Sequence, residues 1–219
     1  MIRVARLVAV KDLRVEWRSR VILWQVLPFG VMTLLLMGFA EGPETTLSPS
    51  VAAGLFYVVV LFVSMLVIAR SATIESSPGT ANSISMLGLD PAGVFLGKAT
   101  AVFLEVLLSA LILLAGTTLL LHLPLALALH SLPSVVLVVM GLSLAGTLYG
   151  ALTSGLTGSP TLLPLLVLPT MAPLLIAGER TISAIATHQT WSSWLGLLIV
   201  FDVGYTVAGI LLYGVVEDS

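Results

Sequence analysis

Six long apolar stretches determine what kind of solvent this chain can fold in. A helix needs about 20 mainly apolar residues to cross the hydrocarbon core of a membrane, within a range of roughly 17 to 25. The six runs cover residues 21–39, 52–69, 99–121, 132–152, 162–177 and 194–216. We therefore predict an all-α polytopic membrane protein with six transmembrane helices, folded as a single transmembrane domain over residues 1–219.

The composition supports this prediction, because 58% of the residues are hydrophobic and only 9% are charged. With a mean hydropathy of +1.13, a water-soluble domain would have to expose a largely apolar surface. A net charge of −2 argues against nucleic acid as a partner. The absence of cysteine excludes disulfides, thiol nucleophiles and thiolate metal sites.

The basic residues predict the orientation in the membrane. Six of the nine precede the first apolar run, and two more bracket the segment between the second and third runs. These eight are Arg3, Arg6, Lys11, Arg14, Arg18, Arg20, Arg70 and Lys98, whereas Arg180 lies elsewhere. Because Lys and Arg accumulate in cytoplasmic loops, we predict that both of these regions and both termini are cytoplasmic.

The fifth run is the weakest of the six. It is short and contains Pro164, Pro169 and Pro173. Each proline removes a backbone donor and tends to kink a helix. We therefore expect a broken or tilted span there.

Residues 1–20 predict an amphipathic helix that lies along the membrane surface. Its apolar stripe consists of Ile2, Ala5, Val8, Ala9, Leu13 and Trp17. One interpretation is an electrostatic anchor to lipid headgroups. The other is a mixed-sign docking surface for a partner protein, made of Lys11, Asp12, Arg14, Glu16 and Arg18.

The predicted cytoplasmic loop over residues 70–98 carries most of the functional signal. Ser77, Pro78 and Gly79 indicate a turn, and a short helix after it would bring Ile84 and Leu87 to the surface. An exposed apolar patch on a cytoplasmic loop favours docking of a partner. The alternative is that this helix folds back onto the membrane.

Two acids fall inside predicted spans, Glu105 in the third and Asp202 in the sixth. Ionisable groups inside a membrane are costly and therefore candidate functional residues. The simpler interpretation is that each faces a helix partner or a shallow water-filled recess. The histidines His122, His130 and His188 fall in predicted external loops, and we do not interpret them as metal or haem ligands.

The sequence contains no motif for nucleotide binding and no residue pattern typical of an enzyme active site. There is no Gly-x-x-x-x-Gly-Lys-Ser/Thr phosphate loop, and no nucleophile, carboxylate pair or histidine cluster suggests an active site. We predict no enzyme activity and no bound cofactor or metal in this chain. Any ATP must be hydrolysed by a partner subunit.

Three segments, in order along the chain, resemble the CcmB family of cytochrome c maturation permeases. They are residues 11–18, residues 42–44 followed by Leu47, Gly54 and Tyr57, and residues 166–176 with Pro169 and Pro173. The resemblance covers essentially the whole chain. It implies an ABC-2 exporter-type permease in the bacterial inner membrane, present in two copies and driven by a separate cytoplasmic ATPase, CcmA.

The resemblance also implies partners and coupling residues. Such a complex contains CcmC and CcmD, and it uses ATP to release the haem-loaded chaperone CcmE or to export haem. The coupling helix of related permeases maps onto roughly residues 75–87, which makes the implied ATPase-coupling residues Glu75, Gly79, Asn82, Ile84, Leu87 and Lys98. The family commonly has an acid at the position of Asn82 and a more acidic stretch at the positions of Ser76, Ser77 and Pro78, so docking here is expected to depend more on apolar contact. It also commonly has a tryptophan at the position of Tyr57.

Two alternatives stay open at this point. The same fold with the same amphipathic helix and coupling loop serves ABC-2 exporters of lipid, polysaccharide or drug. A proton-linked secondary transporter would instead use Glu105 and Asp202, with the kinked fifth span as a broken helix near the midplane.

Overall fold

The computed structural model describes residues 1–40, 47–75, 90–154 and 162–217, and these residues are almost entirely helical. Of residues 73–75, 153–154, 162–167 and 215–217 it describes the backbone alone. The elements are α1 (Ile2–Ser19), the π-helix η1 (Ile22–Val26), α2 (Leu27–Ala40), α3 (Pro49–Glu75), α5 (Pro91–Leu120), α6 (Leu125–His130), α7 (Leu132–Ser154), α8 (Leu162–Ala186) and α9 (Ser192–Glu217).

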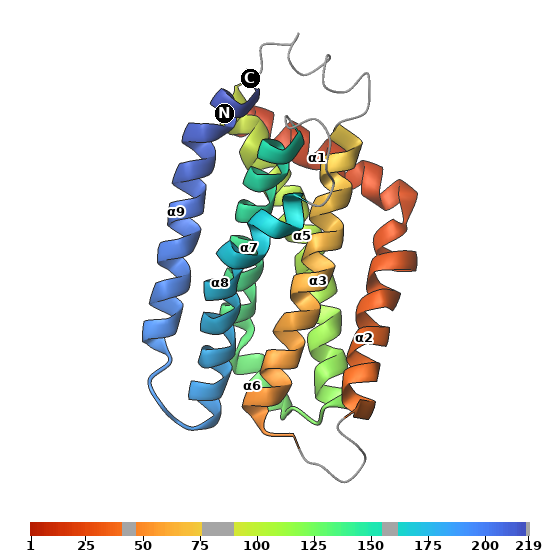
Figure 1. The fold of residues 1–219 in the computed structure, drawn as a ribbon, viewed down its shortest axis with the longest axis vertical. Helices are drawn as coiled ribbons and strands as arrows, with labels where there is room; N and C mark the ends of the chain where they lie inside the picture. Colours follow the sequence, from red (N-terminus) through yellow and green to blue (C-terminus); the bar gives the residue numbers. More distant parts are fainter. Residues whose placement is uncertain (41–46, 76–89, 155–161, 218–219) are drawn as a thin grey trace.

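The long helices run along one another in an elongated bundle (Figure 1). At one end α1 lies across the bundle, and α9 finishes at that same end (Figure 1). The short helix α6 lies at the opposite end. We call these the α1 end and the α6 end.

Five helical segments in the described part of the chain are long and apolar enough to cross a membrane. They are Ile22–Ala40, Pro49–Ala72, Pro91–Leu120, Leu132–Leu152 and Ser192–Gly214. These segments confirm a polytopic membrane protein and correspond to five of the six predicted runs. The sixth run lies in α8, which packs against α3, α7 and α9 in the same bundle.

α8 differs from the prediction for the fifth run. It is continuous from Leu162 to Ala186 with Pro169 and Pro173 inside it, so the helix is not broken. It also extends beyond residue 177, the predicted end. Glu179 and Arg180, which follow that predicted end, are both helical, and their side chains lie 3.5 Å apart in an ion pair.

Helices α3 and α5 extend beyond their apolar runs into the predicted loop. Arg70 lies within α3 and Lys98 within α5, so both ends of the range 70–98 are helical. At about 1.5 Å per residue, the 30 residues of α5 exceed what a hydrocarbon core of about 30 Å requires. The part of α5 nearest the α1 end therefore extends past the apolar core.

Apolar side chains fill the bundle interior and also cover its outside. Tyr57, Phe56, Leu113 and Leu142 are fully buried, while many large apolar side chains of α2 and α9 are exposed. Lipid is the solvent that suits such a surface. The helices thus bring the α1 end and the α6 end to opposite sides of an apolar belt.

Candidate functional site

The α1 end is built around close contact between α1 and α5. A Cβ added to Gly97 would lie 2.5 Å from the Ala5 carbonyl oxygen and 2.7 Å from the Val8 Cβ. One added to Gly93 would lie 2.8 Å from the Met1 carbonyl oxygen. The two glycines, one helical turn apart, therefore let the α1 backbone rest directly on α5.

Glu16 joins α1 to α3 at this end. Arg70 donates from Nε to Glu16 Oε2 at 2.8 Å and from Nη2 to Ser19 Oγ at 2.9 Å. The Ile22 backbone N–H donates to Glu16 Oε1 at 3.1 Å. Glu16 is buried, and its carboxylate binds partners within the chain. The sequence had placed this residue on a docking surface for a partner protein.

The other predicted docking residues of α1 lie closer to solvent. Lys11, Arg14 and Arg18 are exposed, and Lys11 forms an ion pair with the half-buried Asp12 at 3.0 Å. The apolar stripe is also only partly covered, because Ile2 and Trp17 are exposed. α1 therefore has a face against α5 and a basic face directed away from the bundle.

Glu105 lines a cavity beneath the C-terminal part of α1. The cavity has a volume of about 390 Å³. Its lining consists of Leu13, Glu16, Trp17, Arg20, Ile22, Leu23, Leu104, Glu105 and Leu108. Glu105 is thus near the α1 end and the start of η1, and it does not share this cavity with Asp202.

Asp202 is buried between α7, α8 and α9. Its carboxylate oxygens have no hydrogen-bond partner among the described residues. A Cβ added to Gly141 would lie 2.6 Å from Asp202 Oδ1. One turn further along α9, Tyr205 donates to the Thr170 carbonyl of α8 at 3.0 Å, between Pro169 and Pro173. Pro169 is exposed and Pro173 half-buried.

The predicted coupling residues lie mostly outside the described structure. Gly79, Asn82, Ile84 and Leu87 fall in residues 76–89, and only the backbone of Glu75 is described. Lys98 is buried, and its Nζ lies 6.0 Å from the ring centroid of Tyr213. The segment 76–89 joins two helices that both contact α1. Arg70 of α3 binds Glu16, and Gly97 of α5 packs against the α1 backbone.

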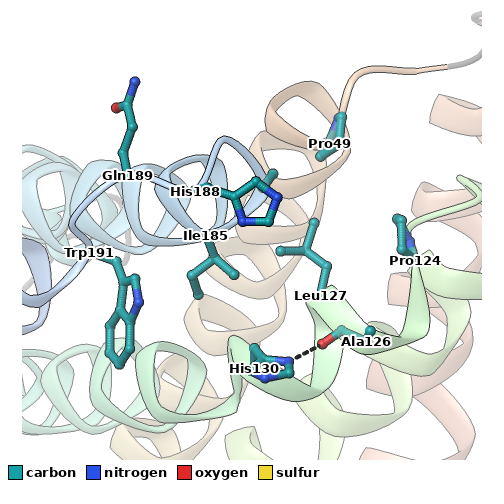
Figure 2. Close-up of a pocket in the computed structure, with 10 residues that line it drawn as sticks. Pro49, Pro124, Ala126, Leu127, His130, Ile185, His188, Gln189 and Trp191 are labelled. Atoms are coloured by element: carbon teal, nitrogen blue, oxygen red, sulfur yellow. Dashed lines mark hydrogen bonds between the residues drawn. The ribbon is translucent and has the colours of Figure 1, made fainter.

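A second, larger cavity lies at the α6 end, with a volume of about 610 Å³. Figure 2 shows its lining, in which the His130 and His188 rings lie on either side of Leu127 and Ile185. The remaining lining residues are Pro49, Pro124, Ala126, Ala186, Gln189 and Trp191. The sequence placed both histidines in loops, whereas His130 is the last residue of α6.

Comparison with known proteins identifies the family. The chain is 28% identical over 172 residues to Heme exporter protein B of Rhodobacter capsulatus, covering 78% of this chain and 79% of that protein. It is 30% identical over 173 residues to Heme exporter protein B of Paracoccus denitrificans, covering 79% of each. The family model described as CcmB protein matches residues 3–212. The chain therefore belongs to the CcmB protein family.

Proposed function

We propose that this chain is the membrane subunit of an ATP-driven complex that handles haem during cytochrome c maturation. The observation that carries the proposal is the family match, which extends over residues 3–212 and therefore over nearly every helix of the bundle. The two relatives named Heme exporter protein B, each covered over 79% of its length, supply the link to haem.

The proposal assigns ATP hydrolysis to a separate, CcmA-like subunit. The sequence has no phosphate loop, and a permease of the ABC-2 type leaves nucleotide chemistry to its partner. The complex further contains CcmC-like and CcmD-like membrane subunits, a CcmE-like haem chaperone, and two copies of this chain. It resides in the bacterial inner membrane with six spans and both termini in the cytoplasm.

Contact with the ATPase is assigned to the α1 end. Glu75, Gly79, Asn82, Ile84 and Leu87 form the coupling segment between α3 and α5. Lys98 is buried beside Tyr213, so its contribution is to position α5 rather than to touch the ATPase. The basic residues of α1, exposed at the same end, add a surface for the partner or for anionic lipid headgroups.

Deletion of the gene tests the function. We expect covalent c-type cytochromes to disappear from haem-stained gels while b-type cytochromes persist, because haem synthesis does not involve this chain. Restoration by the wild-type gene is the control. Normal c-type bands in a strain with a single copy of the gene would contradict the cytochrome role, and an altered lipid, polysaccharide or drug phenotype would instead favour a generic exporter.

A further inference from the structure

The cavity between α1, η1 and α5 has an apolar wall that is accessible from outside the bundle. Its volume of about 390 Å³ falls within the roughly 300–1,000 Å³ that is typical of ligand pockets. Leu23, Leu104 and Leu108 line it, and all three are exposed. A molecule in the surrounding lipid can therefore enter this cavity without crossing the bundle interior.

The cavity lies where the first span enters the membrane. Arg20 follows α1 directly, and the apolar segment Ile22–Ala40 begins two residues later. Trp17 also lines the cavity, and tryptophan is enriched at the boundary between headgroups and hydrocarbon. Because Glu105 lines the same cavity as Arg20, it lies near this boundary as well.

Glu105 and Arg20 bring a carboxyl and a guanidinium group to this boundary. Neither side chain forms a hydrogen bond or an ion pair with another residue that the structure describes. Glu16, the other acid in the lining, is already paired with Arg70 at 2.8 Å. An ionised carboxylate beside hydrocarbon is costly unless a cation pairs with it, so the cavity favours a ligand that brings a positive group to Glu105.

The local backbone also singles out Arg20. Its φ is 53°, in the left-handed region that glycine occupies most readily, and its N–H donates to the Glu16 carbonyl at 2.9 Å. A glycine would end α1 in this way at lower cost, so the turn itself does not require an arginine. The chain then continues into the π-helix η1, which supplies Ile22 and Leu23 to the lining. Short π-helical turns frequently occur at functional sites.

These groups discriminate between phospholipid headgroups. A phosphate suits the Arg20 guanidinium. Phosphatidylethanolamine adds a primary ammonium, which like that of lysine has three N–H donors for a carboxylate. The quaternary ammonium of phosphatidylcholine has no N–H, and phosphatidylglycerol has no cation to place beside Glu105. The primary-amine headgroup is therefore the best match to the two free side chains.

We propose that this cavity binds a phospholipid of the phosphatidylethanolamine type. Glu105 accepts hydrogen bonds from its ammonium group, Arg20 binds its phosphate, and an acyl chain lies along Leu104 and Leu108. The lipid fills the space between α1 and α5 and is a structural ligand rather than cargo. This site does not depend on which molecule the complex handles.

Fluorescence quenching of the full chain in nanodiscs tests the proposal. The sequence has four tryptophans, and replacing Trp24, Trp191 and Trp194 with Phe leaves Trp17 as a single reporter beside the cavity. Lipids with brominated acyl chains quench a tryptophan that they contact. Titrating brominated phosphatidylethanolamine, phosphatidylcholine or phosphatidylglycerol into unbrominated phosphatidylcholine gives their relative affinities. We expect phosphatidylethanolamine to bind about tenfold more tightly than phosphatidylcholine, because its ammonium group makes charge-assisted hydrogen bonds.

Two substitutions separate the roles of the polar groups. Glu105→Gln should bring the affinity for phosphatidylethanolamine to within about twofold of that for phosphatidylcholine. It should also raise the affinity for phosphatidylglycerol, because the repulsion between two negative groups is lost. Arg20→Gln should weaken all three lipids and leave the ratio of phosphatidylethanolamine to phosphatidylcholine near tenfold, because every headgroup carries the phosphate.

Glu179→Gln is the matched control, because Glu179 is a half-buried acid that does not line this cavity. It should keep the tenfold ratio. A chain with Trp24 as its only tryptophan should report no preference, since Trp24 is exposed on η1 and is not part of the lining. All variants should elute from a sizing column as wild type does.

Three results would overturn the proposal. Equal affinities at Trp17 would leave the cavity to a protein occupant, such as a helix of a partner subunit. A tenfold ratio that survives Glu105→Gln would show that the carboxyl does not recognise the ammonium. The same preference at Trp24 would show a general enrichment of phosphatidylethanolamine around the protein instead of a site.

Discussion

Breaking the Glu16–Arg70 ion pair should release α1 from the bundle. Arg70→Met removes the 2.8 Å bond to Glu16 Oε2 and the 2.9 Å bond to Ser19 Oγ. It leaves the Glu16 carboxylate, whose side chain is 9% exposed, with the Ile22 N–H as its remaining partner among the bonds described above. Without Arg70, movement of α1 away from the bundle hydrates this carboxylate more fully, which favours the open state.

The expected free-energy cost of breaking this ion pair lies between the cost for a fully buried pair and the cost for an exposed pair. Breaking a fully buried ion pair costs about 3–5 kcal/mol, whereas an exposed pair is worth about 0–1 kcal/mol. Arg70 is 29% exposed and Ile22 continues to donate, so we estimate about 2 kcal/mol for opening α1. Because about 1.4 kcal/mol corresponds to a tenfold change in equilibrium, the open population should rise about 30-fold.

Thiol labelling measures this opening directly. The native chain has no cysteine, so Ala9→Cys, placed at a buried position of α1, gives a single reporter. When opening and closing are fast, the labelling rate follows the population of the open state. The Ala9→Cys/Arg70→Met chain should therefore label about 30-fold faster than Ala9→Cys alone.

Lys11→Met is the matched control, since Lys11 belongs to the more exposed ion pair with Asp12. Its effect on labelling should stay within a factor of about five, in line with the small worth of exposed pairs. The double substitution Glu16→Gln/Arg70→Met should label more slowly than Arg70→Met, because no unpaired carboxylate is left. If Arg70→Met labels no faster than Lys11→Met, the ion pair does not hold α1 in place.

Three further changes test other parts of the bundle. Gly97→Val should speed Ala9→Cys labelling, because crowding of this kind costs about 1–3 kcal/mol, whereas Gly196→Ala, with nothing within 4 Å of its Cβ, should not. Asp202→Asn should keep or raise the thermal midpoint of the purified chain, because a neutral amide replaces a buried carboxylate that has no described partner. A large fall in this midpoint would show that the carboxylate has a stabilising partner. Leu87→Asp should reduce copurification of the ATPase while membrane insertion persists, and unchanged copurification would place the main dock elsewhere.

Hydropathy alone predicted most of the bundle. The apolar runs became long helices because a membrane span must satisfy its backbone hydrogen bonds internally, and this requirement depends on composition rather than on tertiary detail. Helix ends were less predictable. The fifth apolar run ends at residue 177, yet α8 continues through Glu179 and Arg180 as far as Ala186.

The contacts at the α1 end could not be predicted from the sequence. Glu16 and Arg70 are 54 residues apart, and nothing local distinguishes Glu16 from the exposed charges beside it. Gly93 and Gly97 are a pair of small residues four apart, a common pattern in membrane helices, and the pattern does not say which helix will pack there. His130 and His188 come together only because α6 and α8 end at the same side of the bundle.

The α1 end also indicates how the proposed ATPase contact would reach the rest of the bundle. The proposed coupling segment follows α3, whose Arg70 binds Glu16, and precedes α5, whose Gly93 and Gly97 contact the α1 backbone. A displacement of that segment would therefore reach α1 by two routes. One is the ion pair with α3, and the other is the tightly packed glycine contact with α5. Since α5 also packs against α7 and α9, and α7 follows directly after α6, packed helices connect the proposed dock with the α6 end. Loss of the Glu16–Arg70 pair should then uncouple ATP hydrolysis from cytochrome c formation even where the ATPase still binds.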